Sequence, residues 1–191
     1  MTSKKTIWLR RAAMMAVVGV AVAIPATLLV RDGGAEPERI GPVTLPSAVE
    51  EPLRTDRGLR VGYRVPRGWK RIREDRTLKL RSRNRTTLVA IAAPASADRA
   101  GRVRRDLLRE IRRAYRGADI RAGGERRVGG LDARTAVIGA RRPGGGRIRI
   151  LLAVAPGKKR TYVVETFTAP GAESRRIVQA QEALNALELR G

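Results

Sequence analysis

The sequence of 191 residues predicts an α+β fold. We expect a mainly antiparallel sheet of about six to seven strands with two amphipathic helices packed against it, preceded by a single N-terminal transmembrane helix. Short segments in which apolar and polar side chains alternate indicate the strands, and stretches rich in Gly and Pro separate them. Two longer segments repeat their apolar residues at helical spacing. An uncharged run near the N-terminus indicates the transmembrane segment.

The transmembrane helix is expected over residues 12–30, where no side chain is charged. A helix of this length can cross about 30 Å of hydrocarbon. The preceding residues 1–11 form a basic tail, and basic flanks tend to stay in the cytoplasm. We therefore expect a single-pass protein of the cytoplasmic membrane whose C-terminal part lies outside the cytoplasm.

A cleaved signal peptide is the alternative interpretation of the same segment. Residues 21–23 (Ala-Val-Ala) fit a small-x-small cleavage site, and residues 33–35 are a second candidate. The apolar run continues through residues 27–30, beyond the first site, which favours an uncleaved anchor. Cleavage would release a secreted soluble domain, so both interpretations export the domain. The absence of cysteine excludes a lipid anchor on that residue.

Residues 31–57 are expected to form an extended linker, because proline blocks helices and central strands. Alternatively, part of this stretch lies along the domain as an irregular arm. The extracytoplasmic α+β domain is expected over residues 58–191. The prolines of the linker are Pro37, Pro42, Pro46 and Pro52.

Three strands are expected before the first helix. Residues 59–65 alternate apolar side chains with Arg and Gly, which is typical of a half-buried strand. Residues 77–81 alternate in the same way, and the apolar residues 86–92 form the third strand. Trp69 follows the first strand in a Pro-Arg-Gly-Trp turn, and we expect it to pack in the core because large aromatic side chains usually bury.

The first helix is expected over residues 98–116, with Asp98 as its N-cap and Gly117 at its end. Apolar side chains recur every four residues and form one face. Asp106 and Glu110 are expected to pair with arginines of the same helix. The opposite face is the candidate site for an anionic partner and carries Arg102, Arg105, Arg109, Arg112, Arg113 and Arg116.

Four more strands and a second helix complete the expected domain. Hairpin-length stretches with Gly and Pro separate the strands, which indicates antiparallel pairing. The helix is expected over residues 172–187, with an apolar stripe that runs from Ile177 to Leu187. The strands are expected over residues 120–128, 133–140, 147–155 and 161–168.

The order of these segments resembles a known group of domains. Residues 63–69 (Tyr-Arg-Val-Pro-Arg-Gly-Trp) are similar to the strand and Pro-x-Gly-Trp opening of the PsbP/Mog1-like domains. Residues 130–133 (Gly-Leu-Asp-Ala), residues 161–164 (Thr-Tyr-Val-Val) and the Leu-Glu-Leu after the last helix match the same layout. The resemblance covers residues 59–189 and implies an α/β/α sandwich. The group includes photosystem accessory subunits, a nuclear-transport cofactor and bacterial envelope lipoproteins, and it implies no shared catalytic residues.

The composition excludes much of enzyme chemistry. The chain has no cysteine and no histidine, so it lacks a thiolate nucleophile, the usual general base and the commonest metal ligand. We therefore expect no catalytic, cofactor-binding or metal-binding residues, and a function that is not enzymatic. An enzyme based on carboxylates alone would need two or more Asp or Glu side chains that converge in one cleft.

The charge of the chain indicates the kind of partner. Lys and Arg number 41 against 18 Asp and Glu, a formal net charge of +23. A GC-rich genome places arginine at solvated positions, yet a positive field attracts anions whatever its origin. The predicted function is a membrane-tethered interaction or accessory module whose basic helix face contacts anionic lipid, a wall polymer or an acidic protein. Export and an aromatic content of 3% disfavour nucleic acid. The alternative is a carrier that holds a small apolar ligand between sheet and helix.

Overall fold

The computed structural model describes residues 51–141 and 145–190. The basic tail, the expected transmembrane helix or signal peptide, and most of the expected linker lie outside the described residues. Within the described ranges, no helix is both long and apolar enough to cross a membrane.

The centre of the domain is a seven-stranded sheet with the order β3-β4-β5-β9-β8-β7-β6. Each neighbouring pair is antiparallel, as the hairpin-length connections predict. Strand β9 lies between β5 and β8, so the last strand of this sheet occupies its middle. The strands are β3 (Lys70–Glu74), β4 (Thr77–Arg81), β5 (Thr87–Ala95), β6 (Arg116–Val128), β7 (Leu131–Arg141), β8 (Arg147–Pro156) and β9 (Thr161–Thr168).

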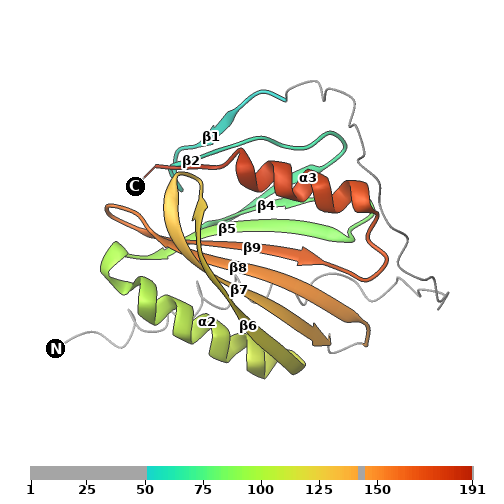
Figure 1. Ribbon diagram of the computed structural model, residues 1–191. Helices are drawn as coiled ribbons and strands as arrows, with labels where there is room; N and C mark the ends of the chain where they lie inside the picture. Colours follow the sequence, from blue (N-terminus) through green and yellow to red (C-terminus); the bar gives the residue numbers. More distant parts are fainter. Residues whose placement is uncertain (1–50, 142–144, 191) are drawn as a thin grey trace.

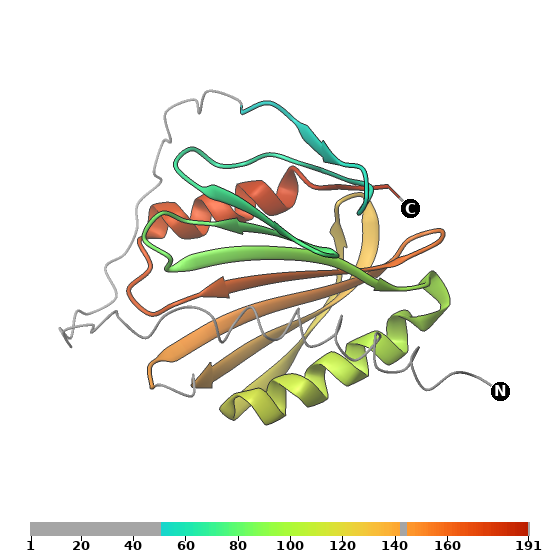
Figure 2. The ribbon, with the colours of Figure 1, turned by 180° about the vertical axis from the view of Figure 1, so that it is seen from behind.

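Helices cover both faces of this sheet (Figures 1 and 2). Helix α2 (Ala100–Ala114), preceded by the short 3₁₀ helix η1 (Ala97–Arg99), packs on one face. Helix α3 (Ser174–Asn185) packs on the other face, together with a small antiparallel sheet of order β1-β2-β10. The expected α+β class and mainly antiparallel pairing are therefore confirmed. The strands of the small sheet are β1 (Arg54–Asp56), β2 (Val61–Tyr63) and β10 (Glu188–Leu189).

The central strands are buried along most of their length because both faces of the large sheet are covered, one by α2 and the other by α3 and the small sheet. In β9, Val163 and Phe167 belong to the core under α2, whereas Tyr162 and Val164 belong to the core under α3. Successive side chains of a strand point to opposite faces, so a strand covered on both faces buries both sets. The apolar runs of β5 and β9 follow from this position.

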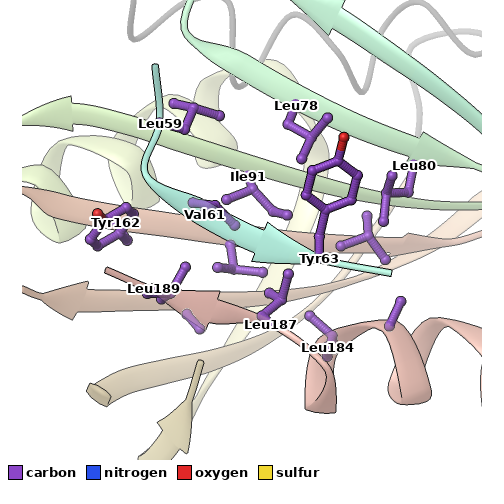
Figure 3. Packing of buried hydrophobic residues seen from close by; sticks show 14 of the residues in the cluster. Leu59, Val61, Tyr63, Leu78, Leu80, Ile91, Tyr162, Leu184, Leu187 and Leu189 are labelled. Carbon is purple, nitrogen blue, oxygen red and sulfur yellow. The ribbon is translucent and has the colours of Figure 1, made fainter. Parts of the chain in front are cut away.

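The core on the α3 side joins the small sheet to the large one (Figure 3). Figure 3 shows Tyr63 of β2 beside Leu78 of β4, and Val61 of β2 beside Ile91 of β5. Trp69 is buried in the same cluster, as expected, and its Nε1 donates a hydrogen bond to Oε1 of Gln179 on α3 at 2.9 Å. The Pro-Arg-Gly-Trp turn thus ties the start of the domain to its last helix.

The first helix is shorter than its apolar periodicity predicts. Asp98 lies in η1, and the N-cap position of α2 is held by Arg99, which makes no side-chain capping bond. At the other end Tyr115 is already extended, with φ −121° and ψ 121°. Arg116 and Gly117 open β6 instead of ending the helix. Gly117 has φ 61°, a conformation that glycine adopts without steric cost, and it bends the chain into the sheet.

Three short strands carry no alternation that predicts them. Strand β3 is an edge strand whose residues are mostly exposed, so its sequence is polar. Strand β10 has only two residues. Strand β1 falls within the stretch expected to be a linker, yet it pairs with β2. Asp56 at its end accepts hydrogen bonds from the backbone N–H of Leu59 at 2.8 Å and from Nε of Arg73 at 2.7 Å.

Candidate anion-binding surface

Helix α2 presents arginines to solvent because its apolar side is fixed against the sheet. Val103, Leu107 and Ile111 are buried in the core beneath it. Successive helical residues are rotated by roughly 100°, so the positions between these apolar residues face outward. The exposed arginines of this surface, called here the α2 arginine face, are Arg102, Arg105, Arg109, Arg112 and Arg113.

Part of this charge is compensated within the helix, as the sequence predicts. Arg109 forms an ion pair with Asp106, and Nη1 of Arg113 lies 3.1 Å from Oε1 of Glu110. Both pairs are largely exposed to solvent, so each contributes little to stability. In the described part of the chain, the arginines of this face whose side chains form neither a hydrogen bond nor an ion pair are Arg102, Arg105 and Arg112.

Arg116 is not part of the α2 arginine face. The helical spacing puts Arg116 in line with Arg109 and Arg112 only if the helix continues past Tyr115, and it does not. Arg116 instead lies in β6, where its backbone pairs with Arg141 of β7. The backbone becomes extended at Tyr115, and the ring of this residue is buried in the core.

A groove opens at the N-terminal end of α2, where four segments of the chain meet. It encloses about 1070 Å³ and lies between the β1–β2 loop, the β3–β4 turn, the end of β5 with the start of α2, and the β8–β9 turn. Both ribbon views show the start of α2 close to the β8–β9 turn (Figures 1 and 2). The basic side chains of this groove, called here the basic groove, are Arg73, Arg76, Arg99, Arg102, Lys159 and Arg160.

Two of these basic side chains are held by the fold. Arg73 donates from Nε to Oδ2 of Asp56 at 2.7 Å and from Nη1 to the carbonyl of Thr77 at 3.3 Å. Arg160 donates from Nη1 to the carbonyl of Gly58 at 2.6 Å. These bonds connect the β3–β4 and β8–β9 turns to the β1–β2 region and so shape the rim of the groove.

The other basic side chains of the groove are not held by hydrogen bonds or ion pairs within the described residues, and the nearby carboxylate of Asp98 interacts only with the charges of Arg99 and Arg102. The carboxylate that lines the groove belongs to Asp106, and it contacts Arg109. Asp98 stands at the start of the helix, where a hydrogen bond with Ser96 lowers its pKa and two neighbouring arginines contribute less. Among the residues that the structure describes, no hydrogen-bond or ion-pair partner is found for the side chains of Arg76, Arg99, Arg102 and Lys159.

Glu165 is buried in the middle of the large sheet. It lies on the α2 side of β9, between Ala90 of β5 and Leu152 of β8, and it is 1% exposed. Its Oε2 has no hydrogen-bond partner among the described residues, and burial raises its pKa to about 8. General acid–base chemistry needs access to a substrate. A carboxyl buried in this way is not placed for it.

The described residues contain no group of three or more His, Cys, Asp or Glu side chains that could hold a metal ion. A second hollow, of about 330 Å³, lies between α3 and the β6–β7 turn. It is lined by apolar side chains such as Val128 and Leu184 and by polar ones such as Gln181. This is the sheet–helix position that the alternative function, a carrier of an apolar ligand, would use.

Sequence reasoning found the α2 arginine face but missed the basic groove. Lys159 and Arg160 lie at one turn and Arg76 at another, and no local pattern in the sequence distinguishes them from other solvated basic residues. Arg102 is the one residue of the predicted face that also lines the groove. Basic residues at turns were the available signal, but the sequence does not say which turns meet in space.

The architecture is shared with solved structures of low sequence identity. The solution structure of cyanobacterial PsbP (CyanoP) from Synechocystis sp. PCC 6803 matches with a TM-score of 0.51 and 12% identity, over 78% of this chain and 99% of that chain. The fold is PsbP-like. This confirms the resemblance carried by the Pro-x-Gly-Trp segment and by the order of the strands. At this identity the likeness concerns the fold of the PsbP-like domain and not its partners.

Two further structures match the PsbP-like domain. A crystal structure from Bacteroides thetaiotaomicron has a TM-score of 0.51 and 14% identity, over 74% of this chain and 49% of that chain, so this chain spans about half of its length. A mutant of the protein Mog1 has a TM-score of 0.47 and 12% identity, over 73% of this chain and 96% of that chain. No family model matches the sequence. Comparison with curated proteins found no match.

Proposed function

We propose that the PsbP-like domain is a non-enzymatic accessory module, held outside the cytoplasm, that contacts an anionic partner through the α2 arginine face. The observation that carries the proposal is the set of unpaired guanidinium groups at Arg102, Arg105 and Arg112 on one surface of a helix. Arginine presents a planar fork of donors that suits carboxylate and phosphate groups. The buried residues on the other side of α2 hold that surface in place.

Support for the location comes from the sequence. Residues 12–30 are uncharged and follow a basic tail, a pattern typical of a signal anchor with its C-terminal part exported. A signal peptide cleaved near residue 23 would export the same domain in soluble form. In the anchored form, the chain between residue 31 and β1 would hold the α2 arginine face near the membrane surface, where anionic lipids and membrane proteins are within reach.

Support for a non-enzymatic role comes from the chemistry of the side chains. The chain has no histidine and no cysteine, and Glu165 is enclosed in the core. The half-buried carboxylates Asp106 and Glu110 pair with arginines of their own helix. These groups are occupied or enclosed, whereas the guanidinium groups of Arg102, Arg105 and Arg112 are free, so the domain is better equipped to bind an anion than to transform a substrate.

The proposal predicts that reversal of charge on this face abolishes partner capture. We would change Arg105, Arg109 and Arg112 to Glu in the full chain and measure capture by cross-linking in cells followed by identification of the cross-linked partner. Each basic residue near a membrane surface contributes about 1 kcal/mol toward anionic lipid. The triple variant should therefore bind at least roughly a hundredfold more weakly.

A matched control separates the face from the total charge. Arg83, Arg147 and Arg149 are exposed residues outside α2, so changing them to Glu alters the net charge by the same amount. Arg147 and Arg149 alternate along β8 with residues of the core under α2, so they lie on the opposite face of the sheet. We expect this control to keep partner capture. Equal loss in both variants would assign the effect to net charge alone, and unchanged capture by the α2 variant would overturn the proposed role of the face. The cross-linked species itself distinguishes lipid, wall polymer and acidic protein.

A further inference from the structure

We infer that the basic groove is a binding site for a phosphate-bearing amphiphile: a small molecule with a phosphate group and an apolar body. The inference goes beyond the proposed function, because it concerns a concave site for a small molecule rather than an exposed helix surface. The groove and the α2 arginine face share only Arg102. Each can therefore be tested without the other.

The charge of the groove comes from segments that are far apart in the sequence. Arg76 comes from the β3–β4 turn, Arg99 from the start of α2 and Lys159 from the β8–β9 turn. Like charges that converge on one hollow repel one another. The lining carboxylate of Asp106 is engaged with Arg109, and Asp56 and Asp98 offset only part of the charge of Arg73, Arg99 and Arg102. Arg76 and Lys159 have no carboxylate partner among the described residues, so much of this repulsion remains. A bound anion would offset the repulsion between these basic side chains. We therefore expect the ligand to carry a negative charge.

The kinds of donor favour phosphate. Free arginines offer paired N–H donors in one plane, and the lysine adds a mobile ammonium group. A phosphate group has several oxygens that can accept from more than one such side chain at once. Arg73 and Arg160 are already held on the rim by Asp56 and by the carbonyl of Gly58, so part of the groove is preformed before any ligand arrives.

The floor of the groove is apolar, which indicates the second part of the ligand. Leu59 and Val103 are buried beneath it, and residues 93–95 (Ala-Pro-Ala) are partly exposed along it. Small-molecule sites enclose about 300–1,000 Å³, and the volume of this groove, about 1070 Å³, is slightly above that range. Inorganic phosphate alone would leave most of this space and the apolar floor in water. An apolar chain or ring attached to the phosphate would cover the floor.

The same chemistry can come from two sources, a phospholipid in the membrane or a soluble phosphate ester. The test uses the full chain in phosphatidylcholine nanodiscs and measures binding of hexyl phosphate and of inorganic phosphate by calorimetry. We expect hexyl phosphate to bind at least about tenfold more tightly, because its alkyl chain covers the apolar floor. Nanodiscs that also contain phosphatidic acid distinguish the sources. Competition that weakens hexyl phosphate binding indicates the membrane lipid, and unchanged binding indicates a soluble ester.

The paired variant R76E and K159E should weaken hexyl phosphate binding by at least about tenfold, because it reverses two of the free cations. The matched control R83E and R149E alters the net charge equally at the other end of the sheet and should leave binding unchanged. The inference is overturned if hexyl phosphate does not bind, if inorganic phosphate binds as tightly, or if both variants lose binding equally. Charge reversal at Arg105 and Arg112 should leave this binding intact, so failure here and failure of the proposed function are distinguishable.

Discussion

At the scale of single residues, Glu165 is an ionisable side chain buried among apolar ones. Its neighbours across the sheet are Ala90 and Leu152, and no hydrogen bond is found for its Oε2 within the described residues. A buried carboxyl in apolar surroundings favours the neutral form, so its pKa rises to about 8. Neighbouring positions on the same side of β9, Val163 and Phe167, are apolar core residues. Glu165 therefore costs stability whenever it must ionise.

The pH dependence of stability follows from this pKa. Between the ordinary value of 4.5 and the folded value of about 8, the folded protein holds a proton that the unfolded chain has released. The contribution of Glu165 to the free energy of unfolding is therefore fully present below pH 4.5 and falls by about 1.4 kcal/mol per pH unit through this window. We expect the Glu165→Gln variant to show a smaller change in the free energy of unfolding with pH. We also expect it to be more stable than the native protein near neutral pH. Urea denaturation across the window measures both effects.

A matched control for this prediction is Glu182→Gln, which changes an exposed glutamate on α3. In this control, the free energy of unfolding should depend on pH as it does in the native protein. If Glu165→Gln shows the same slope as the native protein, the buried carboxyl is not the group responsible.

At the scale of elements, the two-residue strand β10 joins three parts of the molecule. Its backbone pairs with β2, and Leu189 is buried in the core under α3. The N–H of Leu189 also donates to the carbonyl of Gly129 in the β6–β7 turn at 2.9 Å. A Cβ at Gly129 would lie 2.5 Å from Cγ of Leu189. Glycine at this position therefore lets the turn approach the end of the chain.

Gly129→Ala should destabilise the domain more than Gly130→Ala. Both glycines have positive φ, 59° and 84°, so alanine at either site is strained by roughly 1 kcal/mol. Nothing lies within 4 Å of a Cβ built at Gly130, whereas the same atom at Gly129 meets Leu189. We expect an additional cost of about 1–3 kcal/mol at Gly129. Urea denaturation measures the difference, and equal costs would show that the turn does not need this close approach.

At the scale of the whole molecule, the net charge of +23 is spread over a chain of 191 residues. Such a charge destabilises a compact state through self-repulsion, because the unfolded chain keeps its charges further apart. The described ion pairs, such as Arg121 with Asp119 and Arg190 with Glu188, offset only part of it and lie mostly at the surface. An anionic partner or ligand would relieve the same repulsion.

Added salt should therefore raise the thermal midpoint. Raising sodium chloride from about 10 mM to 150 mM shortens the screening length from roughly 30 Å to 8 Å. We expect the midpoint of the full chain to rise by a few degrees, measured by circular dichroism. Sodium chloride is used because phosphate or sulfate could occupy the basic groove. A midpoint that stays constant or falls would show that repulsion between charges is not limiting.

The sequence by itself determined the features that repeat at short range. The strand expected over residues 161–168 and the helical spacing of Val103, Leu107 and Ile111 are both present in the structure. Such patterns are local, because each depends on the geometry of a single strand or helix. The α2 arginine face follows for the same reason, since apolar residues on one side of a helix leave the other side to solvent.

Only the tertiary structure decided where these elements end and which of their ends meet. The helix stops before Arg116 because Tyr115 is drawn into the core, and β3 forms because β4 offers a free edge. The basic groove exists because the β3–β4 turn, the start of α2 and the β8–β9 turn are brought to one end of the sheet. These are contacts between segments that are far apart in the chain. Local periodicity contains no information about them, so the predicted arginine face was accessible from the sequence and the groove was not.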